Sequence, residues 1–169
     1  MKSIVYRMFA IVLVIIISAK VSAEQIIDEK EFSLSLPNTW KVLNINVKGR
    51  GFTANLYDEQ SSVIQLSVLA PNKGVSLDAV REKMRSTLGK DETKQNWMLL
   101  RAEVKNTEHH GEIEEEFWLE KSGELMSVTR NVYGENKLAI FTYTFKVSNE
   151  GGAQFSKIFT NGFKWKIIN

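Results

Sequence analysis

Residues 108–120, EHHGEIEEEFWLE, form the stretch of this sequence whose residue types could do chemistry. The adjacent imidazoles of His109 and His110 stand there beside a run of glutamates. Imidazole and carboxylate groups bind divalent metals and act as general acids and bases. A divalent-metal-dependent hydrolase that uses His109 or His110 with nearby glutamates is therefore one hypothesis for this chain.

The alternation of residue types in the same stretch favours one solvated face of a β-strand instead. Successive strand residues point to opposite faces of a sheet, so every second residue shares a face. One face is expected to carry the acidic residues: Glu112, Glu114, Glu116 and Glu120, together with Trp118. The other face is expected to carry Ile113, Glu115, Phe117 and Leu119. Arg130 and Lys146 on neighbouring strands are candidates to pair with these carboxylates across the sheet.

A metal centre receives only weak support from the spacing. His109 and His110 precede Gly111 and are expected in a turn, and the HExxH spacing that puts two histidines on one helical face is absent. A hard cation held loosely by Glu112, Glu114 and Glu116 is the alternative that the pattern leaves open. The sequence otherwise predicts no catalytic residue and no cofactor.

Other catalytic signatures are missing from the chain. There is no GxSxG nucleophile elbow, no GxGxxG or P-loop glycine pattern, and no cysteine. Without thiols the protein cannot use thiol catalysis, disulfide exchange or cysteine-ligated metals. Both histidines lie in one place, so a Ser-His-Asp triad would have to use one of them.

The first twenty-three residues are predicted to be a secretory signal peptide. Lys2 and Arg7 form a positive start, residues 8–19 are apolar, and Val21 and Ala23 supply small residues before the cut. Because Lys20 interrupts the apolar run before the roughly 20 residues that a spanning helix needs, cleavage after Ala23 is favoured over a retained membrane anchor. We therefore expect a periplasmic or secreted protein.

Removing the leader makes the protein nearly neutral. The whole chain has 22 basic and 20 acidic residues, and the leader holds three of the basic ones and no acidic one. The mature segment then carries 19 against 20, a formal net charge of −1. This balance provides neither the basic patch expected of a nucleic-acid-binding protein nor that of a protein that binds membrane surfaces.

Residues 24–169 are the length of a single ordinary domain, and most of them alternate as strands do. Strands are predicted around residues 31–36, 40–45, 50–59, 61–71, 96–106, 111–120, 123–134 and 136–148, with a bend at Pro37-Asn38. Residues 76–91, SLDAVREKMRSTLGKD, predict a helix that starts at the N-cap Ser76 and stops at Gly89. Its apolar stripe of Leu77, Val80, Met84 and Leu88 is expected to pack on the core. A second helix is expected within residues 148–166.

The order of these pieces resembles the PsbP-like superfamily, including its DcrB-type and LpqN-type exported bacterial proteins. The resemblance rests on the opening FSLSLPNTW (Phe32, Pro37 and Trp40), the hairpin, the capped helix, the long meander and the closing F-x-W (Phe163 and Trp165). It implies an α+β fold, an αβα sandwich whose central antiparallel sheet of about six to seven strands is flanked by two or more helices. Superfamily members mostly serve as binding and assembly modules, so the resemblance also implies a non-enzymatic protein.

These observations predict an exported, non-catalytic binding or accessory protein whose partner is another protein. Trp118, with Glu116 and Glu114 beside it, is the candidate binding surface, because an exposed tryptophan on a charged face is typical of interfaces. The alternative for Trp118 is a covering second layer. An immunity or chaperone-type factor for a secreted protein is an alternative function, and the sequence leaves the oligomeric state open.

Overall fold

The computed structural model describes residues 25–48, 51–58, 62–90, 93–94, 96–148 and 158–166. The predicted leader and its cleavage site lie outside these residues. In chain order the elements are β1 (Gln25–Asp28), β2 (Phe32–Leu36), β3 (Trp40–Lys48), β4 (Gly51–Asp58), β5 (Val63–Leu69), α2 (Leu77–Thr87), β6 (Thr93–Lys94), β7 (Trp97–Thr107), β8 (Gly111–Glu120), β9 (Leu125–Tyr133), β10 (Leu138–Lys146), η1 (Ile158–Gly162) and β11 (Phe163–Trp165).

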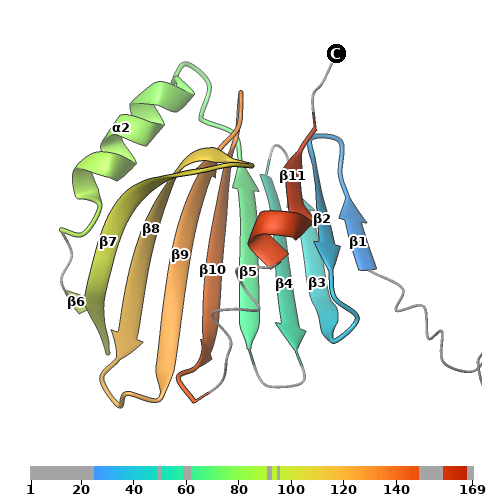
Figure 1. Cartoon of the computed structure of the whole chain (residues 1–169). Coiled ribbons are helices and arrows are strands. Elements are labelled where there is room, and N and C mark those ends of the chain that lie inside the picture. Colours follow the sequence, from blue (N-terminus) through green and yellow to red (C-terminus); the bar gives the residue numbers. More distant parts are fainter. Residues whose placement is uncertain are drawn as a thin grey trace, which may run out of the picture.

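An eight-stranded antiparallel sheet dominates the structure, with strand order β3-β4-β5-β10-β9-β8-β7-β6 (Figure 1). Two meanders build it, β3-β4-β5 and β6-β7-β8-β9-β10, and the pairing of β5 with β10 joins them. The predicted hairpin and long meander are both confirmed. A second sheet of three strands, β1-β2-β11, accompanies the large one.

The bend predicted at Pro37-Asn38 is the point where the chain changes sheets. The Trp40 amide donates to the Pro37 carbonyl over 2.9 Å, which closes a tight turn between β2 and β3. Proline suits this place because it has no N–H to give to a strand ladder. As a result, β2 pairs with β1 and β11, whereas β3 becomes an edge strand of the large sheet.

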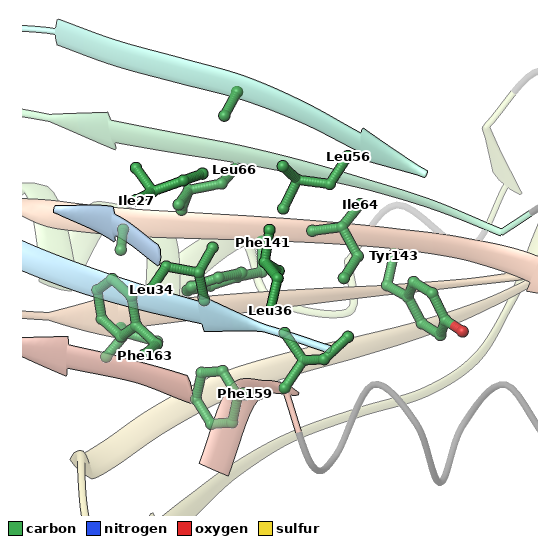
Figure 2. Close-up of a cluster of buried hydrophobic side chains, with 14 of the residues drawn as sticks. Ile27, Leu34, Leu36, Leu56, Ile64, Leu66, Phe141, Tyr143, Phe159 and Phe163 are labelled. Carbon is green, nitrogen blue, oxygen red and sulfur yellow. The ribbon is translucent and has the colours of Figure 1, made fainter. Parts of the chain in front are cut away.

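The hydrophobic core lies between the small sheet with η1 and one face of the large sheet (Figure 2). Every second residue of β2, β4, β5 and β10 points into it, as the period-two pattern predicts. Phe141 is fully buried and meets Phe163 edge to face, with ring centroids 5.0 Å apart. Each large side chain buried in this way contributes roughly 1.5–3 kcal/mol of transfer free energy.

The predicted helix forms as α2. Ser76 is its N-cap, and its hydroxyl accepts from the Ala79 amide at 3.1 Å. Gly89, just beyond the end, has a φ of +69° and lies so close to β7 that an added Cβ would be 2.9 Å from the Ala102 Cβ. No residue of α2 is buried, so its apolar stripe is only half-covered and does not enter the core.

The expected flanking by two or more helices is wrong for the part of the chain that the structure describes. Residues 149–157 of the second predicted helix lie outside that part, and residues 158–162 form only the five-residue π-helical turn η1. The small sheet covers the core face instead, because β2 and β11 carry alternating apolar residues that seal it as a helix would. The large sheet also has eight strands rather than six or seven. None of the described helices is long and apolar enough to cross a membrane.

Candidate functional site

The glutamate-rich stretch forms β8 in the interior of the large sheet, between β7 and β9. The strand register confirms the predicted alternation, with Glu115 opposite Arg130 and Glu116 opposite Thr129. Glu112, Glu114, Glu116 and Trp118 therefore share one face, and Glu115 lies on the other face among the core residues. The expectation that the acidic face is open to solvent is wrong for the middle of the strand, because Glu114 and Trp118 are buried, whereas the Glu112 side chain is 37% exposed.

Glu114 lies at the centre of a polar cluster that connects the sheet to α2. Its Oε2 accepts from the Tyr133 hydroxyl at 2.9 Å and from the Asn131 amide at 3.2 Å. Arg85 of α2 pairs with Glu112 and lies 3.6 Å from the other Glu114 oxygen. Glu114 is only 1% exposed, so these contacts replace the water that its carboxylate would otherwise bind.

Tyr133 extends this cluster toward the start of α2. The Arg81 guanidinium lies 4.3 Å from the centre of the Tyr133 ring, a cation–π contact. Burial raises the pKa of the Tyr133 hydroxyl, and the hydrogen bond to Glu114 raises it further. The phenol therefore stays protonated as a donor, and Arg81 and Arg85 connect α2 to this polar cluster of the sheet.

Trp118 and Glu116 do not form the exposed surface that the sequence suggested. The Trp118 indole N–H donates to Glu116 Oε2 at 3.2 Å, and the Gly89 amide donates to Glu116 Oε1 at 3.2 Å. The alternative of a covering second layer thus agrees with the structure for Trp118. A binding role for Trp118, Glu116 and Glu114 stays an untested prediction, but it has lost the exposure on which it depended.

Glu115 is fully buried on the core face, where it forms ion pairs with Arg130 and Lys105. Arg130 also places its guanidinium 4.6 Å from the centre of the Phe159 ring. Arg130 does pair with a glutamate, as expected, but inside the protein and not on a solvated face. The other candidate, Lys146, is exposed at the end of β10.

The two histidines occupy the predicted turn between β7 and β8 and point to different surroundings. His109 is exposed, whereas the His110 Nε2 lies 3.1 Å from the Phe159 carbonyl oxygen and its ring packs 4.6 Å from the Phe159 ring. Burial lowers the pKa of His110, more than the bond to Phe159 raises it. His110 therefore acts as a neutral donor that anchors η1.

In the residues that the structure describes, the side chains of this stretch do not come together as a metal centre. No group of three or more histidine, aspartate and glutamate side chains is arranged there to hold a metal ion. Glu112 and Glu114 face Arg85, and Glu116 accepts from two N–H groups, so each weak candidate ligand already has a partner.

The open edge of β7 is a feature that sequence reasoning missed. On its outer side β7 pairs only with β6, at Trp97 and Met98, so the outer side of residues 99–107 has no strand beside it within the described ranges. A hollow of about 690 Å³ lies between Leu88 and Gly89 at the end of α2 and residues 98–102 of β7. Leu100, at a bulge in the strand, is 48% exposed, and Val104 is 39% exposed. The apolar run WMLL was the one sign of this feature in the sequence, but periodicity does not show which strand will lie at the edge of a sheet.

Comparison with known proteins identifies the fold. No protein-family model and no curated protein sequence matches the chain. The solution structure of cyanobacterial PsbP (CyanoP) from Synechocystis sp. PCC 6803 is similar with a TM-score of 0.62 and 11% identity, over 88% of this chain and 96% of that one. The Saccharomyces cerevisiae Ran-binding protein Mog1p gives a TM-score of 0.41 and 11% identity, over 80% and 84%. At such identities the likeness to PsbP concerns the fold alone, and this chain has a PsbP-like fold.

Proposed function

We propose that this protein is an exported, non-catalytic binding protein that captures an extended segment of another protein along the open edge of β7. The single observation that carries the proposal is that residues 99–107 of β7 pair with β8 on one side but have no strand on their outer side in the described structure, where a hollow lies against α2. Unpaired backbone groups on such an edge offer donors and acceptors to an added strand.

The side chains along β7 define what kind of segment fits. Ala102 and Val104 lie on the face that carries α2, and the half-buried Leu88 lines the hollow on the same side. Arg101 and Lys105 lie on the opposite face. An added strand would therefore place apolar residues toward α2 and polar or acidic residues on the other side, in alternation.

The contacts of the titratable residues support a binding role over catalysis. Glu114 and Glu115 are both buried, and their carboxylates are engaged in hydrogen bonds and ion pairs. The His110 ring bonds to the Phe159 carbonyl of η1. Export rests on the leader in residues 1–23, cleaved after Ala23. In the chaperone-type alternative, the captured segment would belong to an unfolded secreted protein.

The experiment places a photo-crosslinking amino acid at Leu100 and, separately, at Val104 in the full-length gene product, expressed in its own host. A matched control carries the same group at Val63, which is 43% exposed but lies within the sheet between β4 and β10. Both edge positions should crosslink to the same discrete partner segment, and Val63 should not. Mass spectrometry then identifies the segment.

A synthetic peptide of that segment provides the quantitative test. Calorimetry should show that Val104→Lys weakens its binding by at least about tenfold, whereas Val63→Lys leaves binding unchanged. Hydrogen exchange should show protection of the β7 amides in the complex. Equal binding by Val104→Lys, or protection elsewhere than β7, would refute the proposal. A single native partner supports an accessory role, and many unfolded clients support the chaperone-type alternative.

A further inference from the structure

The opposite edge of the large sheet, β3, differs in character from β7. Besides the exposed polar residues Lys41, Asn44 and Asn46, it exposes large apolar side chains: Leu43 is 66% exposed, Ile45 48% and Val47 62%. A bulge interrupts the pairing with β4 between Val42 and Asn44, after which the register is regular up to the end of β3. No other strand lies on the outer side of β3 in the ranges that the structure describes.

Ile45 and Val47 stand at the rim of the hydrophobic core. They are the register partners of Ala54 and Phe52 on β4, both of which are buried, and Phe52 packs edge to face on Phe32 at 5.0 Å. The core therefore ends at these two exposed side chains. Covering them would continue the core across the edge of the sheet, whereas solvent now meets them directly.

We propose that a second copy of this chain covers this edge, with the two β3 strands paired antiparallel about a two-fold axis at Asn46. In this register Ile45 of each copy faces Val47 of the other, on the core face. Asn46 faces Asn46 on the opposite face, and residue 44 of each copy is the register partner of residue 48 of the other. Only the regular part of β3, residues 44–48, is used.

The residue types on β3 fit a second copy better than a strand of unlike sequence. Apolar residues meet apolar residues in both halves of the symmetric pair, and asparagine meets asparagine at its centre, so no like charges oppose each other. Between Val42 and Val47 the strand carries no charge. Natural edge strands usually carry inward charges or prolines that prevent self-pairing, and β7 does have alternating charged residues (Arg101, Glu103 and Lys105).

The size of the contact sets its strength. Five paired residues on each side bury less than the roughly 1,200–2,000 Å² of a standard interface. The dimer is therefore expected to be weak and concentration-dependent, with a micromolar dissociation constant, and β7 stays open in both copies. The inference is independent of the proposed function, because the two edges lie at opposite ends of the sheet.

Sedimentation equilibrium of the protein, expressed from its full gene and purified as the cell processes it, tests the assembly. The wild type should show a monomer–dimer equilibrium, and Ile45→Lys and Val47→Lys should each weaken dimerisation by at least about tenfold. Val63→Lys is the matched control, since Val63 is comparably exposed but flanked by strands on both sides. Near-ultraviolet circular dichroism confirms that each variant is folded.

Single cysteines test the register, because the chain has no cysteine of its own. Residues directly opposite across antiparallel strands lie about 4.5–5.5 Å apart, within disulfide range. Asn46→Cys should therefore form a disulfide-linked dimer quickly in oxidised glutathione. Asn44→Cys should not, because the two copies of residue 44 would be roughly 13 Å apart at 3.3 Å per residue.

Three results would overturn the proposal. The first is a wild type that stays monomeric at high micromolar concentration. The second is a dimer that Ile45→Lys and Val47→Lys leave intact. The third is crosslinking of Asn46→Cys no faster than that of Asn44→Cys.

Discussion

Removing the charge of Glu115 is expected to destabilise the protein more than any other single change at a glutamate. Glu115 is 0% exposed and lies between the Arg130 and Lys105 side chains, so Glu115→Ala takes this carboxylate away from the Arg130 guanidinium, which is itself only 7% exposed. Solvent cannot replace the lost carboxylate there. Lys105 is partly exposed and can turn its ammonium group to water.

The size of the effect follows from the burial of the pair. Removing one partner of a buried ion pair typically costs about 3–5 kcal/mol, because the remaining charge stays desolvated. A domain of this kind has a free energy of unfolding of about 5–15 kcal/mol, so the variant should be only marginally stable. The double change Glu115→Leu with Arg130→Met removes both charges and should recover most of the loss.

Glu103 provides the matched control. It is the register neighbour of Glu115 on β7, on the same face, but its side chain is 34% exposed and pairs with Arg101 at 3.6 Å. Glu103→Ala should therefore cost only about 0–1 kcal/mol. Urea unfolding followed by tryptophan fluorescence measures all four proteins. A loss below about 1 kcal/mol for Glu115→Ala, or a double variant no more stable than the single one, would contradict the reasoning.

Three further predictions concern α2 and His110. Ser76→Ala removes the N-cap acceptor and should weaken α2 locally by about 1 kcal/mol, seen as faster amide exchange in the helix with strand amides unchanged. Gly89→Ala should lower the free energy of unfolding by about 1–2 kcal/mol because of the left-handed backbone, and further because the new Cβ would be too close to Ala102. Adding Ala102→Gly should restore only the loss that comes from this close contact, as measured by urea unfolding. The pKa of His110 is lowered in the folded state, so the unfolded chain binds a proton at this residue before the folded chain does as the pH falls below 6.5. The free energy of unfolding therefore falls with pH between 6.5 and the lower pKa of the folded state. His110→Gln should remove this part of the pH dependence between pH 7.5 and 5 in urea unfolding, and an unchanged slope would contradict it.

Local features of this protein were determined by the sequence itself. The start of α2 at Ser76 and its stop at Gly89 follow from hydrogen bonds and backbone angles within a few residues. The alternation along β8 and the turn at His109 and His110 follow from the two-residue period of a strand and from the glycine after them. Such signals depend on neighbouring residues alone, so they can be interpreted without knowing the fold.

The tertiary structure alone decided which face of β8 is covered and which strands lie at the edges. Period two separates an acidic face from an apolar one, but it does not reveal that Tyr133, Asn131 and α2 would enclose the acidic face. Carboxylates can be buried once distant residues satisfy them, and those partners come from strands and a helix far along the chain. Strand order likewise depends on packing between distant segments, so the open edges that carry both proposals were visible only in the folded protein.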